Sequence, residues 1–338
     1  MNISFRTRQR LKRTAIIAAI VFAILALIGT LWFVWLKRFV VYTRDHGVIL
    51  DMSLTDDFPN GKPAKPAETT PVTIYYNEGE NAINTGVELS QIVGYYADTE
   101  ALEKGVDTVL SQVKNLPATT PVMIDVKNAK GGFYYTSSVS TKRASSVDTA
   151  AMDELIAYLD DNHYYAIARL PAFRDYEYGL NHVSDGLPTS GGYLWADDDY
   201  CYWLNPASQG TVTYLISIVT ELKALGFDEV VFEEFRFPTT DKIVFNGDKT
   251  QALATTAKTL LTACAADNFA VSFVGNATFP MPDGRSRLYV EGASAAQVED
   301  IATQTGFENP AVNLVFLTEV HDTRFNVFSV LRPLEAAH

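Results

Sequence analysis

The amino-acid sequence predicts a (β/α)8 barrel of the TIM type, preceded by one transmembrane helix. Residues 87–338 number about 250, the usual size of a single barrel of this kind. In this region short apolar runs alternate with amphipathic helical patterns, an order typical of parallel strands joined by right-handed crossovers. A doubly wound sheet is the alternative. It would normally carry a glycine-rich phosphate turn after an early strand, and this sequence has none.

Residues 14–36 contain no charged side chain and are expected to form the transmembrane helix. Five basic residues precede this segment within residues 1–13, and two follow it at 37 and 38. The positive-inside rule then leaves 1–13 as a cytoplasmic basic tail and the bulk of the chain outside the cell membrane. A cleaved signal peptide is the alternative, although its apolar region is usually only about 7–15 residues long.

Residues 37–86 are predicted to be an extracytoplasmic stalk or linker, because prolines recur there and large apolar residues are few. The whole chain has 27 Lys+Arg against 40 Asp+Glu, a formal net charge of −13. Such an acidic protein repels phosphate backbones, so no nucleic-acid partner is expected. Two cysteines and five scattered histidines show no metal-ligand spacing, and we expect neither a metal nor another cofactor.

The first half of residues 87–338 alternates clearly between strands and helices. The runs 92–96, 122–126 and 165–170 are short and apolar, as strands of a buried sheet are. Asp98 is a suitable N-cap for a helix whose apolar positions continue to Val113 on one face. Asp148 is expected to open a second helix, with apolar residues at Met152, Leu155, Ile156 and Leu159.

The second half continues this order with weaker signals. Asn205 is expected to cap a helix with Pro206 at its first position and Gly226 beyond its end, and Asp248 to open the next helix. Ser294 and Gln297 have the spacing of a capping box. Further strands are expected at 230–235, 270–274, 314–317 and 325–330, and a weak one near 288–290. The uncertain region 276–292 leaves open a barrel that is degenerate in its C-terminal third.

Charged residues gather where three predicted strands end, which is where barrel enzymes carry their active sites. Asp125 and Lys127 share one face of the second strand, and Arg169 ends the third. At the end of the fourth strand Glu233 is expected to point into the barrel and Glu234 away from it, because bulky Phe232 suits the layer beneath the helices. Two carboxylates in unlike surroundings, Asp125 and Glu233, are the apparatus of glycoside hydrolysis.

The remaining candidate residues support this pair. Lys127, Arg169 and Arg236 are expected to act as counter-charges, and Glu319 is a second candidate partner for Glu233 if 314–317 is the seventh strand. The alternative for these charges is an ion-pair network that only fills the top of the barrel. Aromatic residues in the loops after the second and third strands offer flat faces for sugar rings, with loop packing as their alternative; they are Tyr134, Tyr135, Trp195, Tyr202 and Trp203.

Four segments resemble the motifs of a putative glycoside hydrolase domain family, barrels found in bacterial surface proteins. They are VMIDVKNAKG at 122–131, YAIARL at 165–170, WLNP at 203–206 and LGFDEVVFEEFRFP at 225–238. The sequence departs from the family pattern at Asn128 and Glu233, where the family commonly has Asp, and at Glu234, which aligns with a Tyr. The resemblance implies a carbohydrate-active barrel.

Together these observations predict a membrane-anchored glycoside hydrolase at the bacterial cell surface, acting on an extracellular or cell-envelope polysaccharide. The alternative is a catalytically inactive barrel that binds glycan or serves as an envelope scaffold.

Overall fold

The computed structural model describes Thr30 and residues 40–43, 47–50, 88–266 and 268–334. The chain divides into two compact units, Met1–Glu68 and Thr69–His338. In the first unit, β1 (Val40–Thr43) and β2 (Gly47–Leu50) pair as an antiparallel hairpin, with Val40 opposite Leu50. The predicted membrane segment 14–36, apart from Thr30, lies outside the described residues. Within the part that the structure describes, no helix combines the length and hydropathy needed to cross a membrane.

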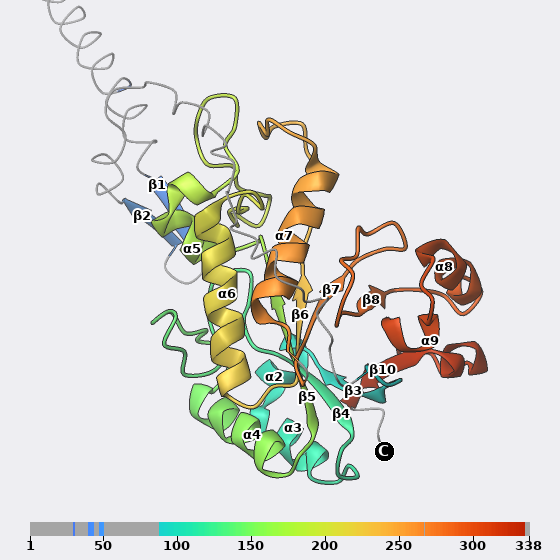
Figure 1. Cartoon of the computed structure of the whole chain (residues 1–338). Helices are drawn as coiled ribbons and strands as arrows, with labels where there is room; N and C mark the ends of the chain where they lie inside the picture. The colour runs from blue at the N-terminus through green and yellow to red at the C-terminus, as the bar shows by residue number, and fades with distance from the viewer. Residues whose placement is uncertain (1–29, 31–39, 44–46, 51–87, 267, 335–338) are drawn as a thin grey trace, which may run out of the picture. The chain divides into compact units, whose positions relative to one another are not determined.

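The second unit contains a closed barrel of eight parallel strands, which confirms the predicted barrel (Figure 1). Consecutive strands are neighbours throughout, and the last strand pairs with the first, Val330 opposite Val93. The C-terminal third is therefore a full part of the barrel. The strands are β3 (Val93–Ala97), β4 (Pro121–Asp125), β5 (Tyr165–Pro171), β6 (Glu229–Glu233), β7 (Ala270–Val274), β8 (Leu288–Glu291), β9 (Leu314–Leu317) and β10 (Ser329–Pro333).

Helices connect most of these strands, and Figure 1 shows α4, α6 and α7 around the outside of the barrel. The described α-helices are α2 (Thr99–Lys104), α3 (Val106–Val113), α4 (Thr149–Asp161), α5 (Tyr176–Asn181), α6 (Gln209–Ala224), α7 (Lys249–Cys264), α8 (Val298–Thr305) and α9 (Pro310–Asn313). Two 3₁₀ helices, η3 (Val183–Asp185) and η4 (Thr323–Val327), lie in the loops.

The strand residues alternate between two apolar layers. Met123, Ile167 and Val231 belong to the cluster inside the barrel. Their neighbours, such as Ile124 and Phe232, belong to the larger cluster between the strands and the helices. This period of two confirms that Val231 faces the barrel axis and Phe232 the helices. Glu233, two residues beyond Val231, is consequently directed toward the barrel mouth.

Helix starts follow the predicted caps in most places. The carboxylates of Asp98, Asp148 and Asp248 each accept a hydrogen bond from a backbone N–H in the first helical turn. The helix predicted from Asp98 to Val113 is however two helices, because the chain breaks at Gly105 with φ of 149°.

The prediction for Asn205 and Pro206 is wrong. Asn205 Oδ1 accepts a bond from the N–H of Ala207 and closes a turn, and α6 begins only at Gln209 with Ser208 as its N-cap. At the other end of this helix Gly226 has φ of 91°, as the predicted C-terminal glycine requires.

Two predictions in the C-terminal third need correction. The strand placed at 325–330 begins only at Ser329, because Thr323–Val327 forms a 3₁₀ helix whose Phe325 is buried. The Ser294–Gln297 pair does form, with Gln297 Oε1 accepting the N–H of Ser294 at 3.0 Å, but α8 starts after it, at Val298.

Candidate active site

Four charged side chains meet at the carboxyl end of the barrel, one each from β4, β5, β6 and β8. Arg169 lies at the centre of this group, which we call the mouth cluster: Asp125, Arg169, Glu233 and Glu291. Arg169 Nε lies 2.7 Å from Asp125 Oδ1, and Nη1 lies 2.7 Å from Glu291 Oε1. Glu233 Oε2 is more distant, at 3.9 Å from Nε. One guanidinium thus contacts three carboxylates, and the mouth carries an excess of acidic groups.

Asp125 is the most firmly held of the three carboxylates. Its Oδ2 accepts from the N–H of Thr99 at 2.7 Å, from the Thr99 hydroxyl at 2.8 Å and from Arg169 Nη2 at 3.2 Å. Its Oδ1 accepts from Arg169 Nε. The residue is only 6% exposed. Four protein donors therefore hold Asp125 in place, two of them from the first residue of α2.

Glu233 has the opposite surroundings. Its carboxyl group has no hydrogen-bond partner among the described residues, and a third of its side chain, 33%, is exposed. Burial raises the pKa of Glu233 to about 7; the charges of Asp125, Glu291 and Glu234 act in the same direction, and the Arg169 cation opposes them. Glu233 can consequently gain and lose a proton near neutral pH, as a general acid does.

Glu291 completes the mouth cluster, and the sequence analysis missed it. The weak strand signal at 288–290 ended one residue before it, whereas β8 extends through Glu291. Tyr289 belongs to the cluster inside the barrel, so Glu291 follows it on the same face. The period of two from Tyr289 to Glu291 was the signal in the sequence that could have identified Glu291. The Glu291 side chain is 46% exposed, more than those of Asp125 and Glu233.

The backbone turns sharply as the chain leaves β6. Glu234 has φ of 49°, a left-handed conformation that is uncommon for a residue with a side chain. This turn buries Phe235 against Phe173, with ring centroids 4.5 Å apart. It also directs Glu234 toward Arg236, at 2.7 Å, and the Arg236 guanidinium lies 4.9 Å from the ring centre of Trp203. Arg236 is therefore the counter-charge of Glu234, and its predicted role toward Asp125 and Glu233 is wrong.

Lys127 also differs from the prediction. Its ammonium lies 2.7 Å from Asp175, and neither side chain is exposed to solvent. Asp175 Oδ2 additionally accepts the hydroxyl of Tyr214 at 2.9 Å. The period of two placed Lys127 beside Asp125, but β4 ends at Asp125 and the alternation ends with it. Lys127 instead ties the loop after β4 to the start of α5.

Three of the five aromatic residues predicted to bind sugar are buried. Tyr134 and Tyr135 are fully buried; their hydroxyls bond to Thr99 and to Glu221. Trp203 is 3% exposed, and its Nε1 donates to Asp197 at 3.0 Å. These three side chains pack the loops, and their predicted contact with substrate is wrong.

The other two aromatics remain partly accessible. Trp195 and Tyr202 are half-buried, and Tyr202 stacks on Tyr176 with ring centroids 5.4 Å apart. Of the five aromatic residues predicted to bind sugar, these two therefore remain candidates.

Glu319 lies near the same end of the barrel. The run 314–317 is the seventh strand counted from β3, and Glu319 follows it as an exposed residue. Burial raises the pKa of Tyr96, and the charge of Glu319 acts in the same direction. Glu319 has no ion pair with Arg169 among the described contacts.

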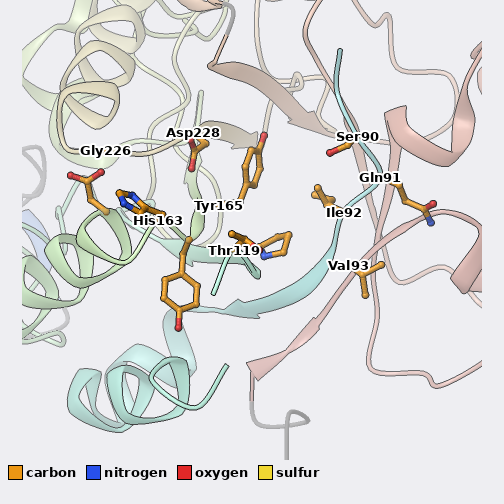
Figure 2. Close-up of a pocket in the computed structure, with 12 residues that line it drawn as sticks. Ser90, Gln91, Ile92, Val93, Thr119, His163, Tyr165, Gly226 and Asp228 are labelled. Atoms are coloured by element: carbon orange, nitrogen blue, oxygen red, sulfur yellow. The ribbon is translucent and has the colours of Figure 1, made fainter. Parts of the chain in front are cut away.

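A cavity of about 550 Å³ lies at the opposite end of the barrel. Val93, Pro121 and Tyr165, which begin β3, β4 and β5, are among its lining residues. Figure 2 shows Gln91 and Val93 on one side and His163 and Asp228 on the other, with Tyr165 between them. None of the mouth cluster reaches it. Within the described residues no group of three His, Cys, Asp or Glu side chains is placed to hold a metal ion.

A closed parallel barrel with carboxylates at the carboxyl ends of its strands is the arrangement of barrel glycoside hydrolases. The family model described as Putative glycosyl hydrolase domain matches residues 95–273, more than half of the chain. The chain belongs to this family. The match ends with β7 and so does not reach Glu291. A search of curated proteins gave no significant match.

Two solved galactosidase structures, each with a TM-score of 0.50, share the fold at low sequence identity. TtGalA, an alpha-galactosidase from Thermus thermophilus in complex with stachyose, is 10% identical, with 73% of this chain and 62% of that chain covered and a TM-score of 0.50. The galactosidase domain of the alpha-galactosidase-sucrose kinase AgaSK is 9% identical, covering 72% and 38%, with a TM-score of 0.50. A hypothetical protein from Ruminiclostridium thermocellum is 20% identical, covering 53% and 96%, with a TM-score of 0.45.

Proposed function

We propose that this protein hydrolyses glycosidic bonds at the mouth cluster, with Glu233 as the proton donor. The observation that carries the proposal is the contrast between Glu233 and its neighbours. Glu233 is partly exposed, lacks a hydrogen-bond partner among the described residues and has a pKa raised to about 7 by burial. Asp125 and Glu291 each contact the Arg169 cation at 2.7 Å.

These surroundings suit the two tasks of glycoside hydrolysis. The leaving sugar needs a proton on its glycosidic oxygen, and a carboxyl with a pKa near 7 can deliver it at neutral pH. The anomeric carbon needs a carboxylate on its other side, either to attack it or to activate water. Family membership supports this assignment, because the matched family is described as a glycosyl hydrolase domain.

The proposed substrate is an extracellular or cell-envelope polysaccharide. The mouth cluster has three carboxylates around one guanidinium, which disfavours anionic sugars by charge repulsion. Half-buried Trp195 and Tyr202 are the proposed surfaces for sugar rings.

We also propose that residues 14–36 anchor the protein in the cell membrane. Residues 14–36 are uncharged and are flanked by basic residues on the N-terminal side, which favours a cytoplasmic N-terminus and an extracytoplasmic barrel. A protease added outside intact cells is expected to remove the barrel and spare the N-terminal tail. Protection of the barrel would contradict this orientation.

A hydrolysis screen with the full chain, over neutral and amino-sugar polysaccharides, tests the activity. On a substrate that the wild type cleaves, Glu233→Gln is expected to lower the rate by about 10²–10⁴ because the amide cannot donate a carboxyl proton. Glu234→Gln is the matched control, since Glu234 pairs with Arg236 and is not part of the mouth cluster. A wild type that binds polysaccharide without cleaving it would instead support the glycan-binding alternative.

A further inference from the structure

We infer that Glu291 is the second catalytic carboxylate, acting at the anomeric carbon opposite Glu233, and that Asp125 is a positioning residue that holds Arg169. The inference rests on the proposed hydrolase function. It reassigns the role that the sequence analysis gave to Asp125. It also places half of the reaction on β8, beyond the region that the family model covers.

The hydrogen bonds of Asp125 leave it little capacity for a substrate. A carboxylate that attacks a sugar, or removes a proton from water, must present an unoccupied oxygen. Asp125 accepts four bonds from Thr99 and Arg169, three of them on Oδ2, and only 9% of its side chain is exposed. Releasing an oxygen would leave donors of half-buried Thr99 and buried Arg169 without an acceptor, which opposes the release.

Glu291 has the free oxygen that Asp125 lacks. The described structure gives its carboxylate one hydrogen bond, from Arg169 Nη1 to Oε1 at 2.7 Å, and none to Oε2. Nearly half of the side chain, 46%, is open to solvent. Glu291 thus has both the access and the acceptor capacity that the reaction needs.

Arg169 connects the three carboxylates and explains why Asp125 matters. Its Nε and Nη2 bind Asp125, which leaves Nη1 directed to Glu291 and Nε within 3.9 Å of Glu233. The guanidinium carries its charge at any physiological pH, so Glu291 is paired with a permanent cation. Asp125 therefore acts through Arg169, fixing the cation against which Glu291 and Glu233 are placed.

The chemical step balances with these two groups. The Glu233 proton passes to the glycosidic oxygen, which leaves with the electron pair of the broken bond to the anomeric carbon. Glu291 enables the new bond to the anomeric carbon in one of two ways, set by the distance between the two carboxyl groups. It forms an ester that water later cleaves, returning a proton to Glu233, or it takes a proton from a water whose oxygen binds the anomeric carbon. The glycoside and water are the only reactants.

Azide distinguishes the two candidates. We compare full-chain Glu291→Ala and Asp125→Ala on an aryl glycoside of a sugar that the wild type cleaves. Glu291→Ala is expected to lose about 10²–10⁴ in rate. Added azide should restore turnover and yield a glycosyl azide of opposite anomeric configuration to the substrate, because azide enters from the side of the missing carboxylate. Asp125→Ala should lose activity and give no glycosyl azide. Removing the Asp125 carboxylate displaces Arg169 but creates no space for azide at the anomeric carbon.

The outcomes separate the inference from the proposed function. An inverted glycosyl azide from Asp125→Ala, with none from Glu291→Ala, overturns the inference and leaves the hydrolase intact. Glu291→Gln provides a variant of nearly unchanged shape, and wild-type rates in this variant also overturn the inference. A wild type that cleaves none of the screened glycosides overturns the proposed function, and the inference with it.

Discussion

Arg169 lies 2.7 Å from Asp125 and from Glu291 but 3.9 Å from Glu233, so the three carboxylates differ in their contact with the one cation. A close guanidinium stabilises a negative charge, whereas burial without a hydrogen-bond donor penalises it. Glu233 experiences mainly burial, with its pKa raised to about 7. Glu233 therefore has surroundings unlike those of Asp125 and Glu291, although all three lie around one arginine.

The pH dependence of hydrolysis follows from the raised pKa of Glu233. The acid form must be present to donate, so kcat/KM is expected to fall as pH rises above about 7, tenfold per pH unit. Glu234→Gln removes one of the charges that raise this pKa, and it should move the limb to slightly lower pH. Rate profiles of both proteins from pH 5 to 9 check this. A wild-type profile that stays flat across neutral pH would exclude Glu233 as the donor.

The raised pKa of Glu233 also makes the free energy of unfolding depend on pH. The direction of the pKa shift sets the sign of this dependence. The folded-state pKa lies above that of the unfolded chain, so the folded protein binds more protons between about pH 4.5 and 7 and loses stability as pH rises through that window. The full shift corresponds to about 3 kcal/mol, reduced to about 1–2 kcal/mol by solvent screening of a side chain that is 33% exposed.

Glu233→Gln is therefore expected to raise the free energy of unfolding by about 1–2 kcal/mol at pH 8 and to change it little at pH 4. Urea unfolding at the two pH values measures the difference. Equal effects at the two pH values would mean that the surroundings of the Glu233 carboxyl do not raise its pKa.

At the scale of elements, the joint between α2 and α3 shows how a helix can be interrupted without losing its apolar face. Leu102 in α2 and Val106, Val109 and Val113 in α3 are all buried, so the pattern continues across the break. Gly105 separates the two helices with φ of 149° and ψ of 116°, a conformation that residues with a side chain rarely adopt. The break limits α2 to six residues, and its first residue, Thr99, donates to Asp125.

Gly105→Ala is expected to destabilise the fold by about 1–3 kcal/mol through backbone strain. Space is not the reason, since an added Cβ would meet its nearest neighbour, Thr108 Oγ1, at 3.6 Å. Gly306→Asn is the matched control, because Gly306 ends α8 at φ of 66°, a region that asparagine tolerates. Thermal unfolding of both variants tests this, and similar losses would point to an effect other than the φ of Gly105.

The elements that the sequence predicted best are those set by local chemistry. Asp148 and Asp248 form side-chain caps because the acceptor and the N–H groups lie within one turn. Glu233 could be chosen over Glu234 because Glu233 is the last residue of the regular strand β6 and shares the face of Val231. The same reasoning failed for Lys127, which lies beyond the end of β4, and for Tyr135, whose hydrogen-bond partner Glu221 is 86 residues away. Contacts made by loops between distant elements leave no period in the sequence.

Across the whole barrel, the two ends are built in opposite ways. At the amino end Glu229 and Arg287 form an ion pair that is almost fully buried. Glu229 also accepts from the hydroxyls of Tyr165 at 2.9 Å and Tyr289 at 3.0 Å, so protein donors satisfy it. At the carboxyl end Glu233 and Glu291 retain exposed, unoccupied oxygens. A satisfied network contributes to the fold, whereas an unsatisfied one is available for chemistry.

The pairing of β10 with β3 also determines how the barrel carries tension. The two strands run in parallel, with Val330 opposite Val93 and Pro333 opposite Tyr96. A force that enters before β3, as it would from the proposed anchor, and leaves after β10 slides the strands along each other. All the hydrogen bonds of this seam then share the load at once, where an antiparallel seam pulled in the same way would open bond by bond. A pull between the start of β3 and the end of β10 therefore loads this seam in shear, the direction in which paired strands resist separation together.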